Sequence, residues 1–161
     1  MNEIIKTKKT YEYGKIINEL RLKLPSYSVN ESAARAIIGA FCAQLDPAAS
    51  ELADIKCAVS EAVTNCIVHA YKDTVGLIYI TVRLYDNSQN RLVSIEIKDK
   101  GRGIEDVKLA RQPLYTTDAE NERSGMGFTV MESFCDRVRV SSGCKKGTTV
   151  TLYKSLKSRA Q

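Results

Sequence analysis

Several features that would indicate a membrane, secreted or metal-binding protein are missing from the sequence. It has no tryptophan and a single histidine among 161 residues. No apolar run approaches the ~20 residues that a membrane-spanning helix needs. The N-terminal stretch MNEIIKTKKT lacks the apolar core of a secretory signal, so we expect a cytoplasmic protein. With 43% hydrophobic and 27% charged residues, the chain has the composition and length of one domain with its own core.

The five cysteines do not form the close pairs that zinc sites use. Their number is odd and no two are spaced as C-x-x-C, so neither a disulfide framework nor a zinc site is expected. A catalytic cysteine needs a nearby base, and the single histidine, His69, has no obvious cysteine partner in the sequence. We expect most of the five to be small buried hydrophobic residues: Cys42, Cys57, Cys66, Cys135 and Cys144.

The net charge of +5 makes the chain mildly basic. Its lysines and arginines are spread along the sequence among acidic residues, and the one local cluster is Lys6, Lys8 and Lys9. A nucleic-acid-binding protein would concentrate basic residues on one element, so direct nucleic-acid binding is not expected. An acidic protein partner or a nucleotide would suit such a surface equally well.

The first third of the sequence predicts an extension, a strand and two helices. Residues 1–17 are polar and weakly patterned, and we expect a flexible extension. Residues 18–25 alternate leucine with charged side chains, the period of a half-buried strand. Asn30 is the expected N-cap of a helix over residues 30–44, which Asp46-Pro47 ends. A longer helix follows, with an apolar stripe for the core at Leu52, Ile55, Val59, Ala62, Val63, Cys66 and Ile67.

The remainder predicts strands around one further helix. Residues 76–86 and 91–99 are expected to form a hairpin through the turn NSQN. The polar stretch 104–124 shows no clear periodicity. A helix at about 126–135 and strands at 137–142 and 148–154 complete the pattern, leaving 156–161 as a C-terminal tail. Because there are no repeats and no linker, we expect one α/β domain over residues 18–155, a sheet with helices packed on one face.

Polar residues on the long helix and two glycine motifs are the candidates for chemistry. Glu61, Asn65 and His69 are spaced by four and share the helix face opposite the apolar stripe, together with Asp54. Taken alone, this face could simply be solvated. Asp99-Lys-Gly-Arg-Gly103 ends a strand with an acceptor and a backbone that can approach a ligand closely, although it could also be a plain turn.

Two further glycine motifs follow along the chain. Ser124-Gly125-Met126-Gly127 opens a helix, where exposed backbone N–H groups and the helix dipole favour an anion. It fits neither a dinucleotide fingerprint, because no strand leads into it, nor a Walker loop, because no GKS or GKT follows. Gly147-Thr148-Thr149 enters the last strand and by itself is common in β proteins.

The order of these motifs resembles that of a known superfamily. ExxxN on a helix, DxGxG after a strand, a polar loop, GxG opening a helix and GTT in a strand resemble the gyrase, histidine-kinase and mismatch-repair (GHKL, or Bergerat) ATPases. More specifically, SEAVTNCIVHAY, ARQPLYTT, ERSGMGFTVMESF and GTTVTL are similar to the anti-sigma F family of sporulating bacteria, which are serine kinases. The resemblance runs from about Asn18 to Ser155, so residues 1–17 are additional. It implies a Bergerat-type α+β sandwich with a mixed, mostly antiparallel sheet.

The resemblance also implies ATP and Mg²⁺ as ligands and assigns residues to them. Asp99 would accept a hydrogen bond from the adenine amino group, and Thr149 would support the adenine edge through water. Asn65 would bind Mg²⁺, and Glu61 would act as general base for a serine hydroxyl. Arg123 would stabilise charge on the γ-phosphate from a lid over 104–124. The other residues expected around ATP are Gly101, Gly103, Thr116, Thr117, Ser124, Gly125, Met126 and Gly127.

Protein partners follow from the same resemblance. They are sporulation sigma factor F, held by a homodimer of the kinase, and an anti-anti-sigma protein that is phosphorylated on serine. Glu31 and Arg35 match partner-facing positions, although a charged pair one turn apart is otherwise an ordinary helix salt bridge. A phosphorylated His69 is not expected, because histidine kinases carry that residue on a separate helical domain. Two alternatives remain open: a nucleotide-gated binding module without phosphotransfer, and a kinase for a general-stress sigma factor.

Overall fold

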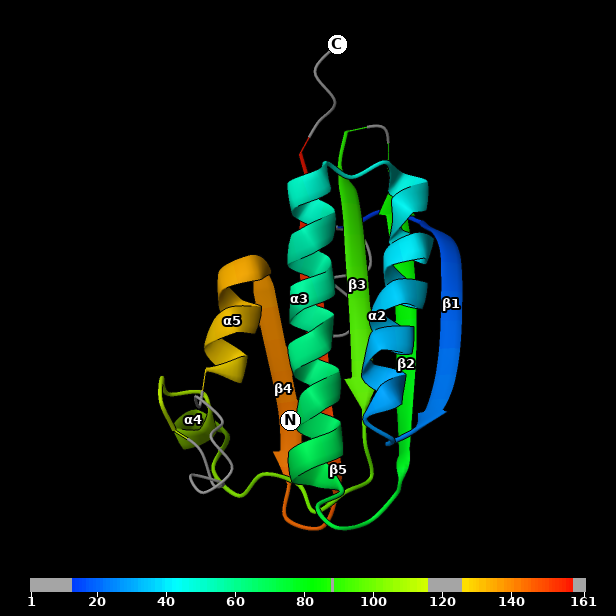
Figure 1. Ribbon diagram of the computed structural model, residues 1–161. Coiled ribbons are helices and arrows are strands. Elements are labelled where there is room, and N and C mark those ends of the chain that lie inside the picture. The colour runs from blue at the N-terminus through cyan, green and yellow to red at the C-terminus, as the bar shows by residue number, and fades with distance from the viewer. Residues whose placement is uncertain (1–12, 88, 116–125, 158–161) are drawn as a thin grey trace.

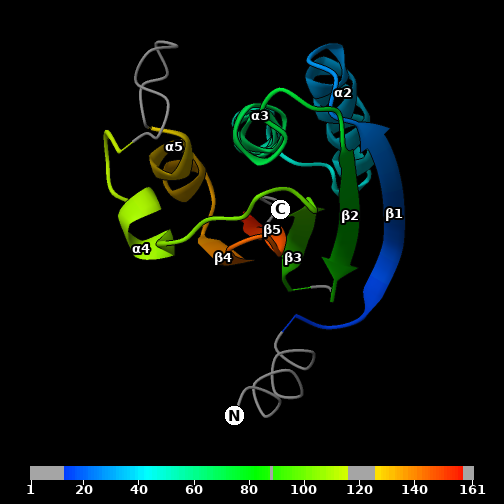
Figure 2. The same cartoon turned by 90° about the horizontal axis from the view of Figure 1, so that it is seen from below.

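The computed structural model describes residues 13–87, 89–115 and 126–157. Five strands form one sheet in the order β1-β2-β3-β5-β4. The helices α2, α3 and α5 cover one face of this sheet, as Figures 1 and 2 show from two directions. In chain order the elements are β1 (Ile16–Pro25), α2 (Val29–Cys42), η1 (Ala43–Leu45), α3 (Ala49–Asn65), η2 (Cys66–Ala70), β2 (Leu77–Asp86), β3 (Arg91–Lys98), α4 (Val107–Ala110), α5 (Gly127–Phe134), β4 (Arg137–Gly143) and β5 (Gly147–Leu156).

The expected arrangement of a sheet with helices on one face is confirmed. Every strand pairing that the structure describes is antiparallel, whereas the sequence predicted a mixed sheet that is mostly antiparallel. The two hairpins β2–β3 and β4–β5 supply strands that are neighbours in sequence and in space. Strand β5 then pairs with β3, so the end of β3 and the start of β5 lie side by side.

The core lies between the sheet and α3, the central helix of the layer. Strand residues with a period of two, such as Ile80, Val82 and Ile95, turn their side chains toward the helices and are 2% exposed or less. Ile55 and Val59 of α3 meet them with 1% exposure or less. Burial of a side chain of this size stabilises the folded state by about 1.5–3 kcal/mol. The predicted apolar stripe is therefore the core face of α3.

The start of α2 differs from the prediction for Asn30. The helix begins at Val29, so Asn30 lies within its first turn and is not the N-cap. Its side-chain amide instead donates to the carbonyl of Pro25 at 2.9 Å. The residue in the cap position is Ser28, whose side chain makes no cap hydrogen bond. Asn30 therefore marked the start of the helix correctly, but its side chain does not cap the helix. It bonds to the preceding strand in place of the backbone of its own helix.

A short helix interrupts the stretch that the sequence left without regular structure. Helix α4 spans four residues and begins after Asp106, whose carboxylate accepts a hydrogen bond from the Leu109 N–H at 2.9 Å. This is the usual side-chain N-cap. Four residues are too few to produce a helical period that a sequence pattern can reveal.

Strand β1 begins at Ile16, two residues before the predicted strand, and the chain just before it contacts the open face of the sheet. The Tyr13 ring lies 5.9 Å from the Tyr153 ring, centroid to centroid, and 6.2 Å from the Tyr85 ring. Both partners point away from the helical layer, because they alternate with the core residues of their strands. Residues 1–12 of the predicted extension lie outside the described ranges.

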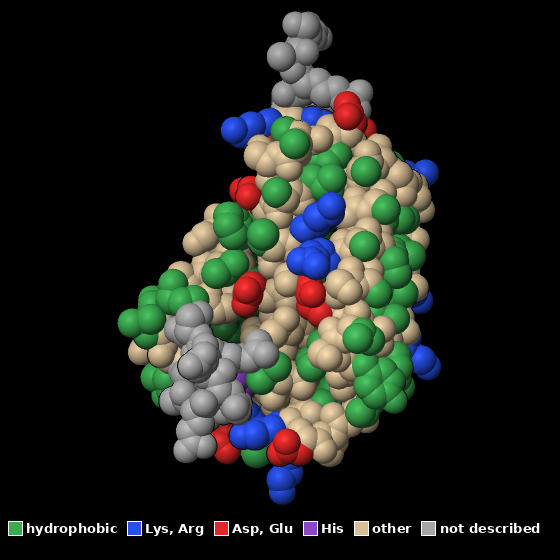
Figure 3. Space-filling view, in the orientation of Figure 1, with side chains coloured by type: hydrophobic (Ala, Val, Ile, Leu, Met, Phe, Trp, Pro, Cys, Tyr) green, Lys and Arg blue, Asp and Glu red, His purple; other side chains and the backbone are tan. Residues whose placement is uncertain are grey.

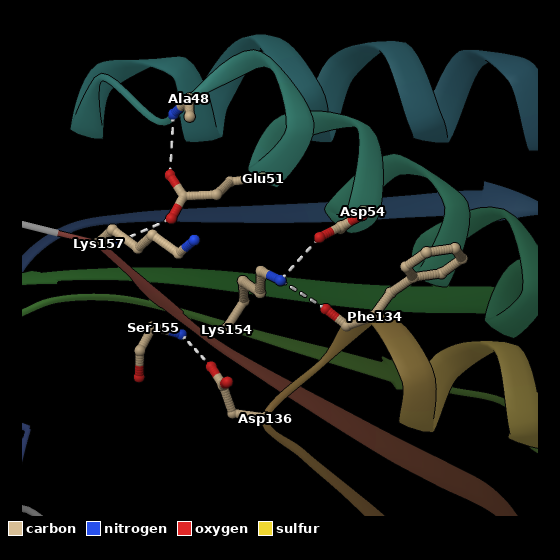
Figure 4. A network of polar contacts seen from close by, with 8 residues as sticks. All are labelled: Ala48, Glu51, Asp54, Phe134, Asp136, Lys154, Ser155 and Lys157. Carbon is tan, nitrogen blue, oxygen red and sulfur yellow. Dashed lines mark hydrogen bonds and ion pairs between the residues drawn. The ribbon is translucent and has the colours of Figure 1, made fainter.

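A network of polar contacts fixes the first half of α3 to the last strand (Figure 4). The carboxylate of Glu51, which is 6% exposed, accepts the N–H of Ala48 at 2.8 Å and the N–H of Lys157 at 2.7 Å. The first of these bonds satisfies a donor at the helix start, and the second joins it to the end of β5. Burial by itself raises the pKa of Glu51, but the hydrogen bonds from Lys157 and Ala48 outweigh it and lower that pKa below 4.5.

Lys154 extends the network toward α5. Its ammonium donates to the carboxylate of Asp54 at 2.9 Å and to the carbonyl of Phe134, the last residue of α5, at 2.8 Å. Asp136 in turn accepts the N–H of Ser155 at 2.6 Å. One lysine of β5 thus connects two helices across the layer (Figure 4).

No helix among the described residues is long and apolar enough to cross a membrane.

We expect Glu51→Gln to destabilise the protein by about 1–3 kcal/mol at pH 7, because a charged acceptor of two N–H groups becomes a neutral amide. The folded-state pKa of Glu51 is depressed, so its contribution is present above the ordinary value of 4.5 and is lost as the pH falls through the folded-state pKa. Urea unfolding at pH 7 and at stepwise lower pH measures this. A difference between parent and variant that did not narrow at low pH would contradict the prediction.

Candidate functional site

A cavity of about 950 Å³ opens where α3 ends and the β4–β5 hairpin turns. These two segments lie at the bottom of Figure 1. Its walls come from the end of α3 and η2, the ends of β3 and β5, the loop with α4, and the start of α5. Apolar side chains such as Ala62, Ile97 and Val150 line it together with a similar number of polar and charged ones. A concave, partly apolar site with converging polar groups is typical of a small-molecule pocket.

Asp99 is the buried polar group of this cavity, and it is 3% exposed. Its Oδ1 accepts the N–H of Gly101 at 2.9 Å and the N–H of Thr148 at 3.1 Å. Its Oδ2 lies 3.6 Å from the Sγ of Cys66, whose thiol donates to it. Burial raises the pKa of the Asp99 carboxyl above 3.8, while the three hydrogen bonds oppose that shift. The Asp99 carboxylate is therefore a hydrogen-bond acceptor that its partners hold in place within the cavity.

The two glycines after Asp99 shape the turn that holds it. Gly103 has a φ of +77°, and a Cβ there would stand 1.9 Å from the carbonyl oxygen of Gly143. A Cβ on Gly101 would stand 2.2 Å from the carbonyl oxygen of Ala70. Gly103 lines the cavity. Gly101 is not a lining residue, and it contributes through its N–H, which donates to the Asp99 carboxylate. The structure therefore requires glycine at both positions for close packing of backbone on backbone.

The threonine beside Asp99 is Thr148, which corrects the prediction of Thr149. Thr148 lines the cavity, its N–H donates to Asp99, and its hydroxyl lies 2.8 Å from that of Ser142. Thr149 is not among the lining residues. Side chains alternate across a strand, so the neighbour of a residue on the helix-covered face points to the open face. The GTT motif in the sequence does not show which of its two threonines faces the helices.

The three polar residues predicted on α3 do share the cavity wall. Glu61 and Asn65 lie in the last turns of α3, and His69 lies in the π-helical turn η2 that continues it. A Cβ built on Gly127 would stand 3.3 Å from Oε2 of Glu61 and 3.4 Å from Oδ1 of Asn65. Two side-chain oxygens therefore lie close to the first turn of α5, in the wall of the cavity.

Met126 and Gly127 line the cavity at the start of α5. The α4 side of the wall includes Asp106, Leu109 and Tyr115. The remaining predicted residues of the lid and the glycine motif lie outside the described ranges: Thr116, Thr117, Arg123, Ser124 and Gly125. Their roles remain predictions.

Sequence reasoning missed several residues of the wall. Cys66 was assigned to the apolar stripe, yet its thiol contacts Asp99. Burial raises the pKa of this thiol well above 9.0, with the neighbouring Asp99 carboxylate as a further cause. Cys144 and Lys145 reach the cavity from the β4–β5 turn, where Lys145 has a φ of +59°. The sequence offered one indication that Cys66 lines the site, namely its position directly after Asn65. Nothing in the sequence indicated that Cys144 and Lys145 line the cavity.

Glu31 and Arg35 lie on α2, apart from the cavity lining. The Nε of Arg35 stands 3.6 Å from Oε1 of Glu31, with the arginine side chain 45% exposed and that of the glutamate 20%. The same helix also carries the exposed apolar side chains Val29 and Ile37, which lie on other sides of it than the charged pair. Figure 3 shows hydrophobic side chains gathered along the edge where α2 and β1 lie.

We expect Gly103→Ala to destabilise the protein by about 1–3 kcal/mol, because the new Cβ meets a backbone carbonyl and the residue must keep a positive φ. Gly143→Ala is the matched control on the other side of the contact. A Cβ there meets only the flexible side chain of Lys146, at 3.4 Å. Thermal unfolding of both variants measures the difference, and equal loss in the two would contradict the strain at Gly103.

Comparison with known proteins places this site in a family. A model of the histidine kinase-like ATPase domain matches residues 25–154. The anti-sigma F factor of Caldanaerobacter subterraneus subsp. tengcongensis is 54% identical over 137 residues, which cover 85% of this chain and 93% of that protein. The anti-sigma F factor of Bacillus subtilis is 50% identical over 145 residues, covering 89% of this chain and 97% of that protein.

A solved structure supports the fold independently. The RsbU and RsbW domains of a Mycobacterium tuberculosis protein superpose with a TM-score of 0.63 at 23% identity, over 89% of this chain and 34% of that one. At this identity the likeness concerns the fold alone. The fold, the cavity around Asp99 and the sequence identities lead to one conclusion: the chain belongs to the anti-sigma F factor family, within the histidine kinase-like ATPase domains.

Proposed function

We propose that this chain is an ATP-dependent serine kinase that also binds sporulation sigma factor F and keeps it inactive. One observation carries the proposal: Asp99, Asn65 and Glu61 line a single cavity, with the start of α5 facing the last two. In this arrangement Asp99 would bind the adenine ring, Asn65 would lie near the phosphates, and Glu61 would accept the proton of the substrate serine. The names of the relatives and their identity of 50–54% to this chain support sigma factor F over a general-stress sigma factor.

The adenine end of ATP would bind at Asp99. Oδ1 is already occupied by two backbone N–H groups, so Oδ2 is the oxygen that would accept the exocyclic amino group. Guanine carries a carbonyl oxygen at that position and would set an acceptor against an acceptor. A buried polar group left without its partner costs about 1–3 kcal/mol, so the site would select adenine. Thr148 would stand beside the base from strand β5.

The phosphates would lie between the end of α3 and the start of α5. Gly127, with the predicted Gly125 and Ser124 before it, would present backbone N–H groups to them. Asn65 fits a Mg²⁺ ion that accompanies the phosphates, because its Oδ1 is a neutral, hard donor facing this space. The ion would neutralise phosphate charge when bound. Arg123, Thr116 and Thr117 are proposed to contact the phosphates from the lid.

Glu61 would act as the general base. Its Oε2 faces the first turn of α5 next to Asn65. The carboxylate would take the proton of the partner's serine hydroxyl as that oxygen attacks the γ-phosphorus. The bond from phosphorus to the β–γ bridging oxygen breaks, and ADP leaves with the electron pair. A closed lid would exclude water and favour transfer to protein over hydrolysis.

The protein partners are proposed to be sigma factor F and an anti-anti-sigma protein, which provides the serine. The kinase would act as a homodimer, and Glu31 and Arg35 would contribute to partner binding from α2. The position of Arg35 supports this, because its side chain is 45% exposed and lies outside the cavity lining. Binding at a site apart from the cavity leaves nucleotide and partner free to bind together.

We expect Glu61→Gln to lower the rate of phosphotransfer to the anti-anti-sigma protein by about 10²–10⁴-fold, because the amide cannot take the serine proton. ATP affinity should not change. The measurement is single-turnover transfer of labelled phosphate from ATP with Mg²⁺, with nucleotide binding followed separately. Glu96→Gln, on the open face of the sheet between the buried Ile95 and Ile97, is a control for the loss of one carboxylate. Full transfer by Glu61→Gln would refute the base assignment.

The same experiment distinguishes the alternative function. If the parent protein binds ATP and a partner tightly but transfers no phosphate, the chain is a nucleotide-gated binding module. The kinase proposal would then fail, while the adenine site could stand.

We expect Arg35→Glu to weaken binding of sigma factor F by about 10-fold or more. Reversing a charge in an interface costs up to several kcal/mol of binding free energy, and about 1.4 kcal/mol corresponds to a tenfold change in Kd. ATP binding should stay as in the parent. Titration calorimetry with each ligand measures both. Unchanged sigma-factor affinity would remove Arg35 from the proposed interface.

A further inference from the structure

The thiol of Cys66 occupies an unusual place at the bottom of the cavity. Cys66 is the first residue of the π-helical turn η2, directly after Asn65, and it is 4% exposed. Its Sγ lies 3.6 Å from Oδ2 of Asp99, close to the usual length of a hydrogen bond from sulfur. The residue also lines the cavity. A contact between a buried thiol and a buried carboxylate is not explained by packing of hydrophobic residues alone.

The two oxygens of Asp99 have different partners. Oδ1 receives the N–H groups of Gly101 and Thr148, at 2.9 and 3.1 Å. Among the described residues, Cys66 provides the only side chain that donates to this carboxylate, and it donates to Oδ2. A carboxylate oxygen can accept two hydrogen bonds. One position on Oδ2 is therefore held by the thiol, and the other is left for a ligand in the cavity.

A thiol suits this position because it is a weak donor. A hydroxyl would form a short bond to a carboxylate and compete more strongly for its electrons. The S–H group gives Oδ2 a direction while leaving it a good acceptor, and the sulfur itself adds apolar surface to the wall. The carboxylate is thereby fixed on both oxygens, one by the backbone and one by Cys66.

We propose that Cys66 is a positioning residue for purine recognition: its thiol orients Oδ2 of Asp99 toward the exocyclic amino group of the base and so strengthens the preference for a 6-aminopurine nucleotide. This inference rests on the proposed binding of ATP at Asp99. It adds a determinant of base specificity that acts through Asp99 and does not touch the phosphates.

Two nucleotides separate this role from simple packing. ATP and purine riboside triphosphate differ only in the amino group, so the ratio of their affinities reports the bond to Asp99. We expect Cys66→Ala to reduce the preference for ATP by about 3- to 10-fold, as for the loss of one modest hydrogen bond. The affinity for purine riboside triphosphate should stay the same. Titration of the full chain with each nucleotide, in the presence of Mg²⁺, gives both constants.

Three variants control the measurement. Cys42→Ala removes an equally buried thiol from α2, which has no contact with Asp99 among the described residues, and should leave the ratio unchanged. Asp99→Asn should abolish the preference, and adding Cys66→Ala to it should then have no further effect on the ratio. Cys66→Ser keeps a donor at the same position and should retain more of the preference than Cys66→Ala. It also provides a folded comparison if the alanine variant proves unstable.

The outcomes distinguish this inference from the proposed function. Equal weakening of both nucleotides by Cys66→Ala, or an unchanged ratio, would overturn the role of Cys66 while leaving Asp99 as the adenine acceptor. A parent protein that bound neither nucleotide would overturn the proposed function itself. A parent that bound the two equally would refute the adenine contact of Asp99, and with it the role of Cys66.

Discussion

The buried carboxylate of Asp99 joins three segments that are far apart in the sequence. It receives N–H groups from the turn that follows β3 and from the start of β5, and a thiol from the end of the α3 helix layer. A charged group buried this deeply is tolerated only when its hydrogen bonds are made, so the surrounding backbone must keep this arrangement. The close glycine contacts in the turn follow from that requirement. The cavity takes its shape from the same constraint.

Helix α3 connects this site to the rest of the molecule. Its apolar stripe forms the core with the sheet, and its first turns are fixed to β5 through Glu51 and Lys157. Lys154 holds Asp54 and the end of α5 in the same region. The opposite end of α3 carries Glu61 and Asn65 to the cavity. A rigid attachment at one end thus keeps the functional residues at the other end in place, which a preorganised site needs.

Long elements with a clear period were predictable from the sequence. The leucine alternation of β1, the hairpin β2–β3, the last two strands and the apolar stripe of α3 all appear close to the predicted residues, because each pattern reflects burial of one face. Local signals were less reliable. Asn30 contacts Pro25 where a cap was expected, and α4 is too short to give a period. In both cases a few contacts outweighed a weak local preference.

The candidate site shows the same division. The sequence alone determined the family and the order of strands and helices. It also indicated Glu61, Asn65 and Asp99 as site candidates, because spacing along one helix and glycines after a strand are local properties. The alternation of Val150 and Leu152 places Thr148, and not Thr149, on the core side of the last strand, and only the tertiary structure decided that Thr148 there faces the cavity. It also decided that Cys66 meets Asp99 and that Glu61 and Asn65 face Gly127. Those pairs are distant in sequence, and their contact exists only once the helical layer has packed on the sheet.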